Sequence, residues 1–248
     1  MKNLKITGIY DNTATERLIP GWGLSLLLEI SGHRVLFDTG SDLMLLSHNL
    51  DELDIRAGDL DTVVLSHPHC DHVGGLSAIL RENADLNVYI TSSFPESLKE
   101  KVKSYGAVLV DESEPIQPCP GAITTGELKG RYRGLDLPEQ GIILETDGGP
   151  VLISGCAHPG IVEITKRAKE IVGGSPYLVL GGFHLGGKEK AEIEKVVEGL
   201  IDNSVENVAP THCTGEKATE MIKSSYGDNF VDFEAGKRID INDDLISF

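Results

Sequence analysis

One short segment of the chain concentrates metal-binding residue types. Three of the eight histidines and an aspartate lie within six residues, as His67, His69, Asp71 and His72. Imidazole nitrogen with carboxylate oxygen is a donor set that borderline ions such as zinc favour. A lone histidine is more often a surface or hydrogen-bonded core residue than a ligand, but three histidines and an aspartate together are hard to assign to packing. The segment predicts an open metal site, since a closed structural zinc site usually contains several thiolates.

The spacing within this segment suits two ions. Side chains alternate along an extended chain, so His67 and His69 point to the same side, and Pro68 stiffens the link between them. Asp71 and His72 follow where the chain turns into a predicted helix, and they can be aimed at a second point nearby. We therefore expect a pair of metal ions.

Three more histidines follow apolar, strand-like runs in the same way. These are His158, His184 and His212, whereas His33 and His48 lie outside the pattern. Loops that follow strands collect on one rim of a sheet. We expect these histidines to meet the first cluster there.

The elements that must position these residues alternate between strand and helix. Apolar runs predict strands over residues 4–10, 24–30, 34–37, 62–65, 88–91, 107–110, 141–145, 150–154, 177–180 and 205–209, followed by two terminal strand-like pieces. Helical spacing predicts helices over residues 43–50, 76–80, 96–105, 161–172, 188–201 and 216–223. The opening segment is expected to be an edge strand. No linker or repeat divides the chain, so residues 1–248 are predicted to form one domain.

Composition and charge limit the classes of partner. Lys and Arg number 22 against 39 Asp and Glu, a formal net charge of −17 that repels a nucleic-acid backbone. No run approaches the ~20 apolar residues of a membrane span, and the start of the chain lacks a signal-peptide pattern. The four cysteines form no C-x-x-C pair. A cytoplasmic protein that binds neither nucleic acid nor membrane is expected.

The motif H-x-H-x-D-H after an apolar strand resembles the signature of the metallo-β-lactamase-fold superfamily. Residues 37–40, which read F-D-T-G, are similar to a motif found upstream in that superfamily. The resemblance implies an α+β fold, a four-layer αββα sandwich. Segments 23–25, 155–160, 181–185 and 212–215 are similar to one branch, which contains the archaeal synthase that joins dihydropterin to ribofuranosylaminobenzene 5′-phosphate and bacterial metal-dependent hydrolases.

The resemblance also implies a ligand set, with departures. No histidine lies between His72 and His158, and Gly155-Cys156 stands where the superfamily has a Gly-Asp that supplies a bridging aspartate. By position, His158 is the replacement. The implied ligands are His67, His69 and His158 for the first ion and Asp71, His72 and His212 for the second.

Other residues near these ligands have two interpretations each. His184 occupies the place where a related tRNA-processing nuclease family has a proton-transfer histidine, so it either donates a proton or binds metal. Cys156 is a further candidate ligand, although a free cysteine is usually a small buried apolar residue. Asp38 either caps a turn or orients a ligand ring. Asp71 is expected to orient the nucleophile as well as to bind metal.

Substrate-binding candidates are fewer. Arg131 and Arg133 lie in a glycine-bounded loop, and Lys188 follows His184; each either binds phosphate or is simply solvated. Trp22, the only tryptophan, either stacks on a flat heterocycle or anchors its loop.

Three functions remain open. The first is hydrolysis of a phosphate-containing small molecule by two divalent transition ions, zinc being favoured and iron or manganese the alternatives. The second, implied by the resemblance, is a synthase reaction that transfers a pterin group and releases diphosphate. The third is a metal store or sensor without catalysis. The oligomeric state is left open.

Overall fold

Strand β2 (Ser25–Ile30) is apolar on both of its faces. Leu26 and Leu28 belong to one buried core, whereas Leu27 belongs to another. In β3 (His33–Phe37), Phe37 and Leu36 divide between the same two cores. Because side chains alternate along a strand, such a sheet has to be covered on both faces.

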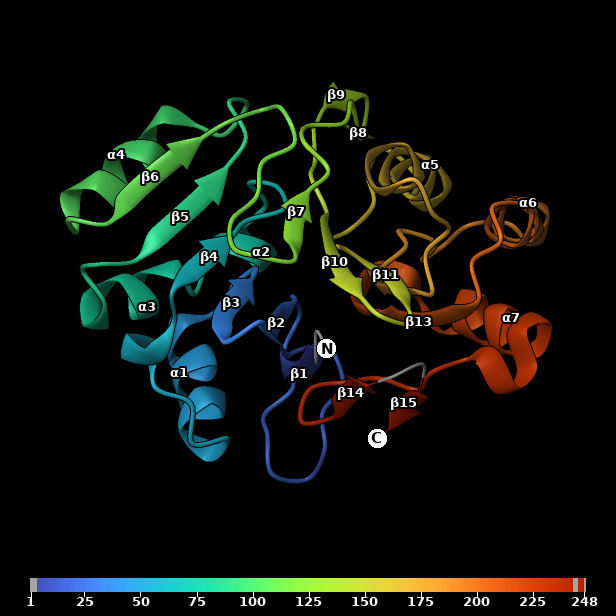
Figure 1. Ribbon diagram of the computed structural model, residues 1–248, viewed down its shortest axis with the longest axis horizontal. Helices are drawn as coiled ribbons and strands as arrows, with labels where there is room; N and C mark the ends of the chain where they lie inside the picture. Colours follow the sequence, from blue (N-terminus) through green and yellow to red (C-terminus); the bar gives the residue numbers. More distant parts are fainter. Residues whose placement is uncertain (1–3, 243–244, 248) are drawn as a thin grey trace.

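The cover consists of a second sheet on one face and helices on the other. The computed structural model describes residues 4–242 and 245–247. In Figure 1 the helices α1, α3 and α4 flank one sheet and α5, α6 and α7 flank the other, with the two sheets between them. The core between the sheets takes side chains from both of them. The layers are helix, sheet, sheet, helix, which confirms the predicted αββα sandwich.

The first sheet has eight strands in the order β15-β14-β1-β2-β3-β4-β5-β6. Besides β2 and β3, its strands are β1 (Leu4–Tyr10), β4 (Thr62–Val64), β5 (Asn87–Ile90), β6 (Val108–Asp111), β14 (Arg238–Asn242) and β15 (Leu245–Ser247). Strands β3 to β6 run parallel. The outer face of this sheet is covered by α1 (Leu43–Glu52), α3 (Leu76–Glu82) and α4 (Glu96–Ser104).

The second sheet has five strands in the order β13-β12-β11-β10-β7. They are β7 (Ala122–Thr124), β10 (Ile142–Thr146), β11 (Gly149–Ser154), β12 (Leu178–Gly182) and β13 (Asn207–Thr211). Its outer face is covered by α5 (Ile161–Val172), α6 (Lys190–Asp202) and α7 (Glu216–Tyr226). Strands β11, β12 and β13 run parallel, so their carboxyl ends lie at one edge.

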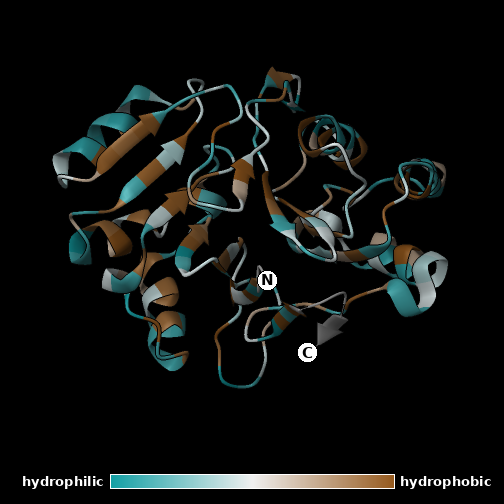
Figure 2. Cartoon of the chain, in the orientation of Figure 1, coloured by the Kyte–Doolittle hydropathy of each residue, from teal (hydrophilic) through white to brown (hydrophobic). Residues whose placement is uncertain are grey.

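Hydropathy explains how the helices dock. In α5 the residues Ile161, Ile164 and Ala168 recur every three or four positions and are buried against the second sheet. Figure 2 shows the same division, with hydrophobic colour along the strands and hydrophilic colour on much of the helices. No helix within residues 4–242 and 245–247 is long and apolar enough to cross a bilayer.

The structure corrects one predicted strand and adds short elements. Strand β1 is not an edge strand, because it pairs with β2 on one side and with β14 on the other. Its partner β14 lies more than two hundred residues further along the chain, a pairing that local pattern does not reveal. The sequence analysis also missed β7, the helical turn α2 (Cys70–Val73), and the hairpin of β8 (Arg131–Tyr132) and β9 (Leu135–Asp136).

Candidate metal centre

All six clustered histidines follow the carboxyl ends of strands. His67, His69 and His72 follow β4, while the other three follow β11, β12 and β13 in turn, as His158, His184 and His212. The two sheets face each other, so the loop from the first sheet meets the three loops from the second. The structure brings together side chains that are up to 145 positions apart, from 67 to 212.

His67, His69 and His158 form the first group. Each offers one ligand atom, and these atoms lie within 4.8 Å of one another. The Nε2 atoms of His67 and His158 are buried and make no hydrogen bond. Buried polar atoms are almost always partnered, so these nitrogens fit an electron-pair acceptor such as a divalent transition ion.

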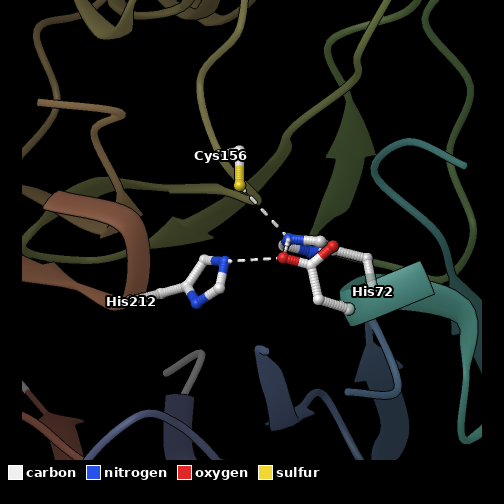
Figure 3. A group of neighbouring side chains, drawn as sticks. His72, Cys156 and His212 are labelled. Carbon is white, nitrogen blue, oxygen red and sulfur yellow. Dashed lines mark hydrogen bonds and ion pairs between the residues drawn. The ribbon is translucent and has the colours of Figure 1, made fainter. Parts of the chain in front are cut away.

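The second group contains the expected Asp71, His72 and His212, and also Cys156. Cys156 Sγ lies 3.2 Å from His72 Nε2, and Asp71 Oδ2 lies 3.5 Å from His212 Nε2. Figure 3 shows the side chains of His72, Cys156 and His212 pointing toward one another. His212 Nε2 is likewise buried without a hydrogen bond. This donor set also fits a divalent transition ion.

In four of these rings, those of His67, His72, His158 and His212, an oxygen contacts Nδ1, which leaves Nε2 directed at the group. His72 Nδ1 donates to Asp38 Oδ2 at 2.6 Å, and His158 Nδ1 donates to Glu139 Oε2 at 2.8 Å. The corresponding contacts are His67 Nδ1 to Ser66 Oγ at 2.9 Å and His212 Nδ1 to Asn12 Oδ1 at 3.1 Å. Such contacts set the tautomer and orientation of a metal-binding ring. Asp38 thus lies where it can orient His72.

Burial and neighbouring charges shift the pKa values of the group. Burial, together with the neighbouring imidazole of His72, lowers the pKa of His67 well below its usual value. Burial also opposes protonation of His72, but the carboxylates of Asp38, Asp71 and Glu139 together outweigh it and raise the pKa of His72 to about 8. Although burial alone would raise the pKa of Asp71, its contacts with His212 and His72 lower it. Asp71 is therefore an anion at neutral pH.

Glu139 is the main site residue that the sequence analysis missed. It is completely buried, and its Oε1 accepts hydrogen bonds from the backbone N–H groups of Cys156 and Ala157 at 2.8 and 2.9 Å. Its Oε2 accepts from the backbone and Nδ1 of His158. The available signal was an acidic residue three positions before the apolar strand β10, since carboxylates are rarely buried unless paired.

Four of the eight non-glycine residues with positive φ in the described part of the chain lie at the same edge. Within the described part of the chain, Asp38, Ala157, His184 and His212 have φ between 50° and 61°. Residues with a Cβ adopt this region at a cost of about 1–3 kcal/mol, and such residues cluster at functional sites. The strain supports a functional role for this edge.

A pocket of about 270 Å³ opens over both groups. It is lined by Trp22, His69, Cys70, Asp71, Tyr132, Cys156, His158, His184 and Cys213. Trp22 is 60% exposed, and its Nε1 donates to Asp71 Oδ2 at 2.8 Å. Tyr132, which the sequence analysis also missed, places its ring centre 5.0 Å from that of His69.

The three basic candidates lie outside this lining. Arg131 pairs with Asp136, and Arg133 lies over the Tyr132 ring, 5.1 Å from its centre. Lys188 pairs with Glu192 at 3.2 Å. Phosphate binding by these residues stays a prediction.

His184 lies beside the first group. Its ring centre is 4.6 Å from that of His158, and its Nδ1 is buried without a hydrogen bond. The interaction with the Cys213 thiol raises the pKa of His184, although burial opposes this. His184 also forms a third group with Cys156 and His158. Its position is compatible with both expected roles, proton donation and metal binding.

Comparison with known proteins agrees with this geometry. A curated relative from Methanocaldococcus jannaschii, 7,8-dihydropterin-6-methyl-4-(beta-D-ribofuranosyl)-aminobenzene-5'-phosphate synthase, is 30% identical over 89% of this chain and 91% of its own length. An uncharacterized protein of the same organism is 31% identical over 94% of this chain and 98% of its own.

Among solved structures, Tm1679, a metal-dependent hydrolase of the beta-lactamase superfamily, aligns with a TM-score of 0.79 and 26% identity. The alignment covers 97% of this chain and all of Tm1679. The family profile of the metallo-beta-lactamase superfamily matches residues 19–192. The chain therefore belongs to the metallo-beta-lactamase superfamily.

Proposed function

We propose that the protein is an enzyme that uses two divalent transition-metal ions, most simply zinc, to act on a phosphate-containing small molecule. The proposed ligands are His67, His69 and His158 for the first ion and Asp71, His72 and His212 for the second. The superfamily generally binds divalent ions, and the name of the synthase relative includes a phosphate.

One observation carries the proposal: buried imidazole nitrogens without hydrogen bonds converge at the strand edge. They are the Nε2 atoms of His67, His158 and His212. An unsatisfied buried polar atom costs about 1–3 kcal/mol, so the folded chain is expected to bind ions that accept their electron pairs. Such ions supply Lewis acidity and lower the pKa of coordinated water.

The remaining pocket residues have separate proposed roles. Asp71 accepts from Trp22 and lies beside His212, so it can orient a nucleophile at the junction of the two groups. Trp22 and Tyr132 form aromatic walls on which a flat substrate group can stack. His184 is placed to donate a proton to the leaving group.

Hydrolysis is the first candidate reaction. It is supported by Tm1679 and by the first group, whose three histidines would hold an ion as in catalytic zinc sites, where water or substrate supplies the remaining ligand. The second candidate is a pterin-transferring synthase that releases diphosphate, which the 30% identical relative favours. A purely metal-binding protein is disfavoured because the two groups open to a pocket.

Three further properties belong to the same proposal. The chain forms one domain, since residues of both sheets share one core. It is cytoplasmic, because its four cysteines are all free thiols, which a reducing compartment preserves. Its partner is a small phosphorylated molecule rather than nucleic acid, given a net charge of −17.

The proposal is tested on protein of known metal content. Elemental analysis after reconstitution should give about two ions per chain, because one ion rarely binds more than four or five protein groups. A panel of phosphodiesters, lactones and a pterin diphosphate with its aminobenzene acceptor should then give turnover with a phosphate-containing substrate. Metal content near zero, unchanged in His67→Ala, would rule out the metal centre. Turnover with lactones alone would rule out the substrate class.

Glu139→Gln is expected to weaken binding of the first ion by about 10- to 100-fold. Both carboxylate oxygens of Glu139 accept hydrogen bonds, so an amide NH₂ in place of one oxygen would face N–H donors. Competition with a chromogenic chelator measures the affinity. Glu163→Gln, on the exposed face of α5, is the control and should bind like the parent. Equal affinity in the two variants would show that Glu139 does not position His158.

A further inference from the structure

A second cavity, of about 550 Å³, adjoins the pocket over the two groups. Trp22 and Cys213 line both cavities, and His212 lines the larger one. The ring centres of Trp22 and His212 are 5.0 Å apart. The two cavities therefore meet at Trp22, and a molecule bound in the smaller one can extend into the larger one.

The walls of this second cavity are built from distant parts of the chain. Most of its lining comes from residues 11–13 after β1, residues 210–220 at the junction of β13 and α7, and residues 230–233 after α7. The N–H of Val231 donates to the carbonyl oxygen of Val208 in β13 at 2.8 Å. Asn12 Nδ2 donates to the carbonyl oxygen of His212 at 2.8 Å. The contacts that shape the cavity thus also hold one of the clustered histidines.

The polar part of the lining is rich in hydrogen-bond acceptors. Its carboxylates belong to Asp11, Glu216, Glu220 and Asp232, and none of these described lining residues is a lysine or an arginine. Lys237, which is outside the lining, pairs with Asp232 at 2.8 Å. Carboxylates accept hydrogen bonds from N–H groups and repel other anions. The cavity is therefore suited to N–H donors and unsuited to phosphate.

Two polar side chains of the lining are almost fully buried. Asp11 is 4% exposed and Thr211 is 6% exposed. Asp11 Oδ1 accepts hydrogen bonds from the backbone N–H groups of Asn12 and His212, at 2.7 and 3.1 Å. Thr211 Oγ1 is buried and has no hydrogen-bond partner in the described part of the chain. Buried polar atoms are almost always partnered, so this hydroxyl is expected to gain a partner when the cavity is filled.

Aromatic rings supply the rest of the recognition surface. Phe230 and Phe233 line the cavity together with Trp22. The Lys223 ammonium lies over the Phe230 ring, 5.4 Å from its centre. Aromatic faces beside hydrogen-bond acceptors match a flat ring that is apolar on its faces and carries N–H groups on its edge.

We propose that this cavity is a substrate subsite that binds an uncharged, flat nitrogen heterocycle with N–H donors. The inference rests on the proposed function, and it names the part of the substrate that lies away from the phosphate. It places the heterocycle on the cavity side of Trp22 rather than between Trp22 and Tyr132.

The test is isothermal titration calorimetry of the full-length, metal-loaded protein with pterin as the probe. Pterin has an amino group and a ring N–H on one edge. Lumazine, in which a carbonyl oxygen replaces the amino group, is the matched ligand. Pterin should bind at least about tenfold more tightly, because the lumazine oxygen would face carboxylate oxygens. Equal affinities would overturn recognition through N–H donors.

Two conservative substitutions locate the binding site. Thr211→Val removes the buried hydroxyl, and Glu220→Gln removes a carboxylate from the rim. Each should weaken pterin binding by roughly three- to tenfold. Thr91→Val is the control for the first, because Thr91 Oγ1 is likewise buried without a partner but lies outside the cavity. Glu163→Gln, on the exposed face of α5, is the control for the second. Parental affinity in both cavity variants would overturn the subsite.

Tyr132→Ala separates the two cavities, because Tyr132 lines only the smaller one. This variant should bind pterin like the parent. Weaker binding in Tyr132→Ala, with Thr211→Val unchanged, would place the heterocycle over the metal ligands and overturn the subsite. Turnover of phosphate-containing substrates without any pterin binding would overturn the subsite alone. Pterin binding that depends on Thr211 in a protein without metal or turnover would overturn the proposed function and leave the subsite standing.

Discussion

Removal of bound ions should lower the free energy of unfolding. The expected loss is about 4 kcal/mol per site when the free ion concentration before removal is a thousand times the dissociation constant of that site. The proposed ligands of the first ion come from two sheets, as His67 and His69 after β4 and His158 after β11. They converge only in the folded chain, so ion binding adds to the stability of the native state. The effect is measured by urea unfolding with and without EDTA, followed by return of Zn²⁺.

The matched variants separate ion binding from general effects of the chelator. On chelation, His67→Ala should lose less free energy of unfolding than the parent, because its first group already lacks one proposed ligand. His48→Ala, at an exposed position of α1, should behave like the parent. The stabilisation should also shrink as the pH falls, since protons compete with the ions for imidazole nitrogen. An unfolding midpoint that EDTA leaves unchanged in the parent would contradict tight native binding.

His184→Ala should lower turnover by roughly 10²- to 10⁴-fold while the metal content stays at the parental value. The His184 ring lies against His158, and the residue has a strained backbone with φ of 52°. In the chain, His184 comes shortly after Gly181 and Gly182, where the backbones at the ends of β11 and β12 approach closely. A general acid placed beside the ions without binding them is needed only for the chemical step.

Measuring the metal content of His184→Ala before its activity distinguishes the two roles of His184, proton donor and metal ligand. Loss of an ion in His184→Ala would assign it as a ligand, through its group with Cys156 and His158. Parental turnover with full metal would remove it from the mechanism. His33→Ala, at a hairpin of the first sheet far along the chain from the ligand loops, controls for the loss of a histidine elsewhere and should leave both quantities unchanged.

The contribution of the sequence to the candidate site is clearest in the first cluster. His67, Asp71 and His72 were found from residue type and spacing alone, because six adjacent residues position their side chains through local backbone geometry. The grouping of His67 with His158 came from the resemblance, and the structure brings these two rings to 4.6 Å between centres. Their role as ligands stays a prediction until metal is measured.

The sequence by itself determined the strand and helix order and, through its motifs, the superfamily and sandwich fold. Most predicted elements were confirmed because hydrophobic alternation and helical spacing are local signals. Only the tertiary structure decided which distant groups meet. Glu139 holds His158 and the Cys156 backbone, and β14 pairs with β1. Such contacts depend on the packing of two sheets across the core, and no local pattern of residues encodes which loop will face which.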